Sequence, residues 1–360
     1  MNRWLALIDR RTRFWIYPGP FELECGAVLP EVRVAYRTWG DPDPEMTNVV
    51  LVCHALTGSA DVDRWWAGML GPGRALDPER DYIICSNVLG SCYGTTGPLS
   101  PRPGSREPWG PDFPPVTIRD MVRLQAALLE YLGVRRLRLV IGGSMGGMQV
   151  LEWALMYPER VEAIVPIATS GRHSAWAIAL SEAQRQAIYA DARWQGGRYE
   201  PEQGPEKGLA AARMMAMCLY RGPESLGRRF GRDLEPGTDR FAVESYLHHQ
   251  GRKLVERFDA NTYVVLTRAM DSHDLARGRG AYESVLRAIR HPALVVGISS
   301  DVLYWPDEAR ELARLLPNAR MAELDSPHGH DAFLIETEQL GVLVAAFRLE
   351  LGHYEPAERR

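Results

Sequence analysis

The sequence has 360 residues, enough for one large α/β domain or two smaller domains, and 46% of them are hydrophobic. The 42 Lys and Arg against 46 Asp and Glu leave a formal net charge of −4, which argues against disorder and against a basic nucleic-acid-binding surface. No run of about 18 apolar residues predicts a membrane span, and residues 1–20 lack the continuous apolar stretch of a signal peptide. The five cysteines form no Cys-x-x-Cys pair, so we expect a reducing, cytoplasmic location.

Short apolar runs bounded by turn residues predict buried parallel strands. These runs cover residues 49–53, 82–85, 137–141, 163–168, 293–298 and 321–324. Two earlier stretches, residues 21–29 and 32–39, predict an antiparallel pair with each other. Residues 117–132 have helical apolar spacing, begin with Thr117 and Asp120 as a capping box and end before Gly133. Strands that alternate with helices predict an α/β fold with a doubly wound, mostly parallel sheet.

This alternation stops between Gly171 and Ala281, where the pattern is helical and polar and contains a stretch rich in Gly and Pro at residues 196–208. The strand pattern returns at residue 293. We therefore predict an α/β core made of residues 1–170 and 282–360, interrupted by a helical insertion at residues 171–281 that acts as a lid.

A strand, a Gly-x-Ser-x-Gly turn and a helix follow one another around Ser144. Gly142 and Gly146 permit a turn so tight that the serine takes a strained backbone conformation and its hydroxyl is exposed at the end of the strand. The N-terminus of the following helix offers backbone N–H groups, the first from Met145, to a developing oxyanion. The pattern predicts that Ser144 is a nucleophile.

A serine nucleophile needs a base and an acid, which follow it in this fold in the order Ser, Asp or Glu, His. Asp301 comes directly after the strand at residues 293–298. His328 and His330 both lie on the loop after the last strand, and their spacing does not choose between them. The second oxyanion donor is expected from a backbone N–H in the loop at residues 54–58.

Several long strings are similar to those of the homoserine O-acetyltransferase family of the α/β-hydrolase superfamily. They are Gly-Gly-Ser-Met-Gly-Gly-Met-Gln-Val-Leu-Glu-Trp at 142–153, Cys-His-Ala-Leu-Thr-Gly-Ser at 53–59, Asn-Val-Leu-Gly-Ser-Cys-Tyr-Gly-Thr-Thr-Gly-Pro at 87–98, Phe-Pro-Pro-Val-Thr-Ile at 113–118 and Gly-His-Asp-Ala-Phe-Leu at 329–334. The resemblance extends over residues 21–347. It implies an α/β-hydrolase fold with an inserted helical lid.

The resemblance also implies the roles of individual residues. Ser144 is the nucleophile, Asp301 the triad acid and His330 the base, while the N–H groups of Leu56 and Met145 form the oxyanion hole. Arg213 and Asp331 match positions that hold the amino-acid substrate, an arginine for its carboxylate and an aspartate for its ammonium.

The activity implied is acetyl transfer from acetyl-CoA, as a co-substrate, to the γ-hydroxyl of L-homoserine for methionine biosynthesis. No resident cofactor or metal and no nucleic-acid or membrane partner is implied, and the lid helices of the family form a homodimer. A succinyl-CoA enzyme, a serine acceptor and, less favoured, an esterase are the alternatives. Succinyl enzymes carry an arginine shortly after the triad Asp, where this chain has Leu303. Two positions depart from the family pattern: His328 replaces Tyr or Gln, and Trp305 interrupts a Tyr-Pro-Pro run.

Overall fold

The computed structural model describes residues 8–200 and 202–353, and its centre is an eight-stranded sheet. In spatial order the strands are β1 (Arg13–Ile16), β4 (Arg33–Trp39), β6 (Tyr82–Ser86), β5 (Val49–Cys53), β7 (Leu139–Gly143), β8 (Ile164–Ile167), β9 (Ala293–Ile298) and β10 (Ala319–Leu324). Six neighbouring strands are parallel to one another, namely β6, β5, β7, β8, β9 and β10, whereas β1 and β4 are antiparallel to their neighbours. The predicted α/β fold is confirmed, and the ends of the six predicted parallel strands differ from the observed ones by at most two residues.

The predicted pairing of residues 21–29 with residues 32–39 is wrong. Residues 21–29 instead fold on themselves, because β2 (Phe21–Glu22) pairs with β3 (Val28–Leu29) across a tight turn that contains Gly26 at a φ of 83°. β4 lies between β1 and β6 in the main sheet. The local turn closes a hairpin within the first segment and leaves the second segment free to join the large sheet.

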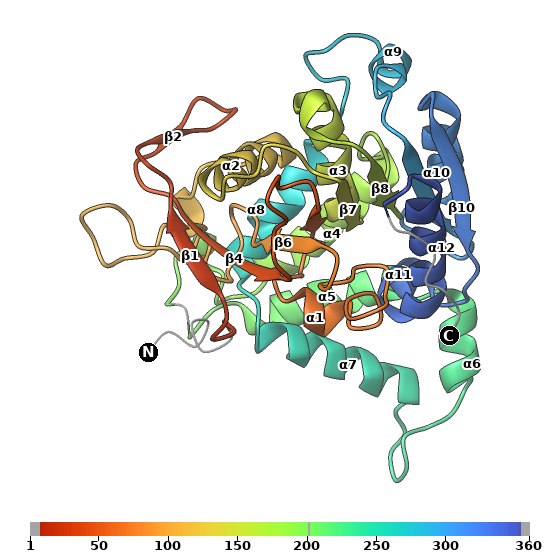
Figure 1. The fold of residues 1–360 in the computed structure, drawn as a ribbon. Coiled ribbons are helices and arrows are strands. Elements are labelled where there is room, and N and C mark those ends of the chain that lie inside the picture. Colours follow the sequence, from red (N-terminus) through yellow and green to blue (C-terminus); the bar gives the residue numbers. More distant parts are fainter. Residues whose placement is uncertain (1–7, 201, 354–360) are drawn as a thin grey trace.

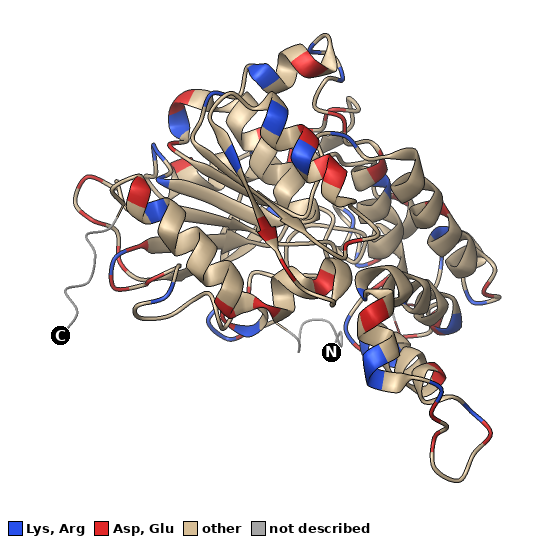
Figure 2. Ribbon diagram, turned by 90° about the vertical axis from the view of Figure 1, so that its right-hand side faces the viewer, with Lys and Arg blue, Asp and Glu red and all other residues tan. Residues whose placement is uncertain are grey.

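Helices cover both faces of the sheet, as Figure 1 shows. Along β5, Val49, Leu51 and Cys53 pack toward α2 (Ile118–Tyr131), α3 (Met145–Met156) and α10 (Pro306–Leu315), whereas Val50 and Val52 pack toward α1 (Val62–Trp65) and α12 (Thr337–Glu350). Few charged residues lie on the strands in Figure 2. Burial on both faces explains why the central strands appear in the sequence as continuous apolar runs. The prediction of a buried strand at residues 321–324 is wrong in this respect, because β10 lies at the edge of the sheet and only Leu324 of it is buried.

Helix α2 begins and ends where the sequence predicts. The Thr117 side chain accepts a hydrogen bond from the Asp120 N–H, and the Asp120 carboxylate accepts one from the Thr117 N–H in return. Gly133 follows the helix at a φ of 78°, a conformation that glycine adopts without strain.

The segment between β8 and β9 contains no strand among its described residues. Its elements are α4 (Ala175–Tyr189), η4 (Gln195–Gly197), α5 (Glu206–Tyr220), α6 (Pro223–Phe230), α7 (Ala242–Val255), α8 (Ala260–Asp271) and α9 (Tyr282–Arg287). We call α4 to α8 the helical insertion. Within it α5 packs against α4 and α7, and α5 also contacts η5 (Gly329–Asp331) of the core. Figure 1 shows α5, α6 and α7 together along one side of the molecule.

The remaining helical turns are η2 (Gly110–Asp112), η3 (Pro158–Arg160) and α11 (Ala332–Ile335). In the part of the chain that the structure describes, no helix is both long enough and apolar enough to cross a bilayer.

Candidate active site

Ser144 sits in a strained turn between β7 and α3, with a φ of 58° and a ψ of −124°. A Cβ at Gly142 would lie 2.7 Å from the Cys53 carbonyl oxygen, and one at Gly146 would collide with that same oxygen. The Ser144 N–H donates to the Ile167 carbonyl of β8 at 2.9 Å, which ties the turn to the neighbouring strand. The two glycines are therefore required sterically, and the strain that they permit presents Ser144 at the end of the strand.

The backbone N–H groups of Leu56 and Met145 donate to no protein acceptor among the described residues. Met145 is the first residue of α3, so its N–H points out of the helix N-terminus beside Ser144. Leu56 lies in a turn closed by a 2.9 Å hydrogen bond from the Gly58 N–H to the Ala55 carbonyl. We call residues 55–58 the oxyanion turn. Both N–H groups remain available to a ligand oxygen.

His54 contacts the Ala55 carbonyl, which belongs to the same peptide unit as the Leu56 N–H. Its Nε2 lies 3.0 Å from the nitrogen of Val88, which can only donate, so Nε2 accepts and the proton sits on Nδ1. Nδ1 then donates to the Ala55 carbonyl at 2.8 Å. Burial lowers the pKa of His54 to about 4, so the ring stays neutral near neutral pH. Nothing in the sequence around His54 indicates this supporting role.

His330 and Asp301 are in direct contact: Nδ1 of the imidazole lies 2.7 Å from Oδ2 of the carboxylate. The other carboxylate oxygen of Asp301 accepts hydrogen bonds from the N–H groups of Leu303 at 2.8 Å and Tyr304 at 3.0 Å. Asp301 and His330 are 2% and 3% exposed, so this pair is shielded from water. The loops after β9 and β10 bring the two residues together because the strands are adjacent and parallel.

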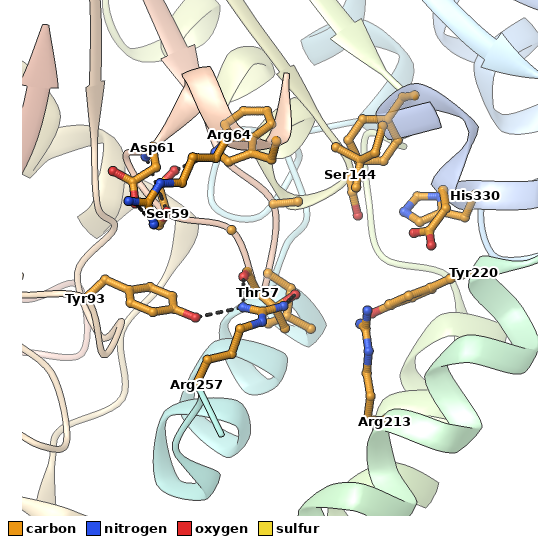
Figure 3. A pocket seen from close by; sticks show the side chains of 17 residues that line it. Thr57, Ser59, Asp61, Arg64, Tyr93, Ser144, Arg213, Tyr220, Arg257 and His330 are labelled. Carbon is orange, nitrogen blue, oxygen red and sulfur yellow. Dashed lines mark hydrogen bonds and ion pairs between the residues drawn. The ribbon is translucent and has the colours of Figure 1, made fainter. Parts of the chain in front are cut away.

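Two opposing effects act on the His330 imidazole. Burial disfavours its charged form, but the charge and hydrogen bond of Asp301 outweigh burial, so the pKa of His330 is raised. The rings of Tyr304, Phe333 and Tyr220 surround it at centroid distances of 5.3, 5.6 and 5.7 Å. The imidazole is thereby held in one orientation toward the space that Ser144 also faces (Figure 3).

A cavity of about 370 Å³ joins these groups. Its lining comprises Ala55, Leu56, Thr57, Gly58, Ser59, Asp61, Arg64, Trp65, Tyr93, Ser144, Arg213, Tyr220, Arg257, His330, Asp331, Phe333 and Leu334. The candidate nucleophile, one candidate oxyanion donor, the candidate base and both residues of the expected amino-acid site therefore line one cavity. This volume suits a small substrate.

Arg213 and Asp331 lie on opposite sides of the core–insertion boundary. Arg213 extends from α5 into the cavity and lies over the Tyr220 ring, 5.2 Å from its centroid (Figure 3). Burial raises the pKa of the Asp331 carboxyl, while the charges of Arg213 and Arg221 act in the opposite direction. Arg221 Nε lies 3.5 Å from Asp331 Oδ2. No carboxylate of the described residues lies within ion-pairing distance of Arg213, which leaves its guanidinium available to a ligand.

Other residues singled out in the sequence lie away from this cavity. His328, the other candidate base, is near Ser225 of α6 and Glu336 and does not line the cavity. Leu303 is 7% exposed within an apolar cluster and also lies outside the lining. Trp305 precedes α10 and is 54% exposed.

Several lining residues were missed by sequence reasoning. Tyr93, Tyr220 and Arg257 carry no local pattern that distinguishes them from other aromatic or basic residues, and they come from three distant segments. The string at residues 87–98, which contains Tyr93, was noticed only for its family resemblance. Their grouping follows from the packing of the insertion on the core.

The alpha/beta hydrolase fold family matches residues 48–337. The homoserine O-acetyltransferase of Trichormus variabilis is 62% identical over 344 residues, which cover 96% of each chain. The structure of homoserine O-acetyltransferase from Bacillus anthracis superposes with a TM-score of 0.86 at 26% identity, covering 94% of this chain and 98% of that one. Esterase E22 gives a TM-score of 0.85 at 28% identity, with coverages of 93% and 99%.

The match to the Trichormus variabilis protein extends over nearly the whole chain, at an identity far above what fold similarity alone requires. The resemblance noticed in the sequence strings is therefore confirmed. The chain belongs to the alpha/beta hydrolase fold family and, within it, to the homoserine O-acetyltransferases.

Proposed function

We propose that this chain transfers the acetyl group of acetyl-CoA to the γ-hydroxyl of L-homoserine, giving coenzyme A and O-acetyl-L-homoserine for methionine biosynthesis. The observation that carries the proposal is the shared cavity in which Ser144 and His330 face Arg213 and Asp331. A Ser-His-Asp triad alone could act on any ester. A cation and an anion beside it, here Arg213 and Asp331, can bind the carboxylate and the ammonium of an amino-acid acceptor. The 62% identity to a homoserine O-acetyltransferase supports the same activity.

In the first half-reaction, Ser144 Oγ attacks the thioester carbonyl while His330 Nε2 takes the hydroxyl proton. The tetrahedral oxyanion accepts hydrogen bonds from the N–H groups of Leu56 and Met145. The C–S bond then breaks, coenzyme A leaves with the proton from His330, and an acetyl ester remains on Ser144. Asp301, 2.7 Å from His330 Nδ1, stabilises the imidazolium formed on the way.

In the second half-reaction, the γ-hydroxyl of homoserine attacks the acetyl-serine and its proton passes to His330. The oxyanion forms in the same hole, the ester bond to Ser144 breaks, and the proton returns to the serine oxygen. Arg213 binds the α-carboxylate and Asp331 the α-ammonium of homoserine, which places the hydroxyl at the acyl-enzyme. This positioning favours the acceptor over water.

Leu303 belongs to the proposal as the residue that favours acetyl over succinyl donors. A succinyl group carries a second carboxylate, and an unpaired charge in a buried site is costly. The chain offers no arginine at this position after Asp301. Serine differs from homoserine by one methylene, which a pocket discriminates by only about 1–3 kcal/mol.

We further propose a cytoplasmic homodimer formed through the insertion, with a core of residues 1–170 and 282–360 and a lid of residues 171–281. Large apolar side chains exposed on this segment support the dimer. They are Trp176, Ile178, Met215, Leu234 and Phe241. The proposal requires that these side chains form one contiguous surface, because a contiguous apolar patch is typical of a protein–protein interface.

The decisive experiment measures steady-state rates with acetyl-CoA or succinyl-CoA against homoserine or serine, and hydrolysis without an acceptor. We expect acetyl-CoA with homoserine to be fastest, with parallel double-reciprocal lines and acetylated Ser144 detected by mass spectrometry. Ser144→Ala should remain folded and lose transfer. Full activity in that variant, or faster hydrolysis than transfer in the wild type, would contradict the proposal.

A further inference from the structure

Arg257 connects the insertion to the oxyanion turn. It lies in the short segment between α7 and α8, and its Nη1 donates to the Thr57 carbonyl at 2.8 Å and to the Tyr93 hydroxyl at 2.7 Å. Its Nη2 lies 3.4 Å from Thr57 Oγ1. Figure 3 shows the guanidinium reaching from this segment to Thr57 and Tyr93. A side chain of the insertion thus contacts the core at the loop that carries Leu56.

The position of this contact matters for the oxyanion hole. Leu56 and Thr57 are the two central residues of the turn closed by the Gly58–Ala55 hydrogen bond. His54 holds the Ala55 carbonyl from the core side at 2.8 Å, and Arg257 holds the Thr57 carbonyl from the insertion side. The Leu56 N–H lies between these two attachments, so both determine where it points.

Arg257 is itself held in place. Tyr93 is 7% exposed and its ring packs against Phe258, the residue next to Arg257, at a centroid distance of 6.0 Å. Among the described residues, Arg257 forms an ion pair with no carboxylate, and its hydrogen-bond partners are neutral oxygens. Its positive charge therefore stays unneutralised at the wall of the cavity in which the oxyanion develops.

We infer that Arg257 is a positioning residue for the oxyanion turn, through which the closed insertion orients the Leu56 N–H toward the reacting carbonyl. The inference rests on the proposed acyl-transfer function. It predicts that the oxyanion hole is complete only when the insertion is packed on the core, so that acyl chemistry depends on this packing. Arg257 acts through the backbone of Thr57 and is not assigned a contact with substrate.

The test compares Arg257→Met and Arg257→Lys with Arg252→Met, a matched control at an exposed arginine of α7. Tyr93→Phe removes the second acceptor of the same Nη1. Each variant is assayed for acetyl transfer and for release of p-nitrophenol from p-nitrophenyl acetate, an acyl donor that requires Ser144 and the oxyanion hole but neither coenzyme A nor homoserine. Circular dichroism and thermal melting establish whether each variant folds.

For Arg257→Met we expect kcat in both assays to fall by about 10- to 100-fold, less than the ~100- to 1000-fold typical for loss of an oxyanion donor itself. KM for homoserine and acetyl-CoA should change by less than about threefold. Tyr93→Phe should show a smaller loss in the same direction, and Arg252→Met none. In Arg257→Ala, added guanidinium should restore part of kcat, which a general loss of packing would not allow.

Three results would overturn the inference. One is unchanged kcat in a folded Arg257→Met variant. Another is a raised KM for acetyl-CoA with normal p-nitrophenyl acetate turnover, which would make Arg257 a donor-binding residue. The third is equal loss in Arg252→Met. Failure of the wild type to acetylate homoserine would instead contradict the proposed function, since the p-nitrophenyl acetate assay tests Arg257 independently of the natural substrates.

Discussion

His328 Nδ1 lies 2.8 Å from Ser225 Oγ, so this imidazole is engaged with helix α6 of the insertion. Its Nε2 lies 3.7 Å from a carboxylate oxygen of Glu336. His330, two residues later, contacts Asp301 and lines the cavity with Ser144. Two histidines that the sequence leaves equivalent thus have different surroundings.

We predict that His330→Ala lowers kcat of acetyl transfer by about 10⁴-fold or more, because it removes the proposed general base. His328→Ala should change kcat by less than about threefold, since it lies outside the cavity. Steady-state kinetics on both folded variants measures the difference. Comparable losses, or a greater loss in His328→Ala, would mean that the base is wrongly assigned.

The raised pKa of His330 predicts the pH dependence. His330 must be neutral to accept the Ser144 proton, so activity should fall as the pH drops through a pKa above the ordinary histidine value of about 6.5. Asp301→Asn removes the charge that favours the imidazolium. The fall of activity on the acid side of the pH profile, its acid limb, should therefore move to lower pH, while kcat/KM itself decreases. Profiles of kcat/KM for p-nitrophenyl acetate test both statements. A wild-type acid limb below about 6.5 would refute them.

Arg213→Met should specifically lower kcat/KM for the acceptor homoserine. Loss of a charged hydrogen bond to the homoserine carboxylate costs about 1.5–3 kcal/mol, which corresponds to a roughly 10- to 100-fold lower kcat/KM for homoserine. Turnover of p-nitrophenyl acetate should stay near the wild-type rate, and Arg252→Met serves as the control. If both assays decline together, Arg213 has a role other than acceptor binding.

Leu303→Arg should lower acetyl transfer and raise succinyl transfer, because it supplies a cation for the second carboxylate. Leu303 is 7% exposed in an apolar cluster, so the arginine must reach the cavity at a cost in stability, and Leu303→Met controls for repacking. The ratio of kcat/KM for the two donors is the readout. A wild-type preference for succinyl-CoA, or an unchanged ratio in a folded Leu303→Arg variant, would contradict the role proposed for Leu303.

Many strands and helix ends of the core can be predicted from the sequence, because adjacent residues determine them. Apolar runs buried on both faces identify the central strands, and adjacent residues alone determine the cap at Thr117. The pairing of β1 with β4 was not predictable in this way. Residues 21–29 carry a strand-like pattern, but a turn at Gly26 folds them into a separate hairpin.

The sequence by itself predicted the turn around Ser144, because a Gly-x-Ser-x-Gly pattern between a strand and a helix is typical of it; the oxygen that excludes a Cβ at Gly142 and Gly146 belongs to Cys53 on the neighbouring strand β5. It also predicted that Asp301 and a histidine follow at the ends of adjacent strands. Spacing did not choose between His328 and His330, and His330 was expected from the family resemblance alone; the tertiary structure places His330 beside Asp301 and brings Arg213 and Arg257 from the insertion into the cavity of Ser144. The positions of Arg213 and Arg257 depend on how the insertion packs on the core, which joins residues far apart in the chain and which no local periodicity or spacing encodes.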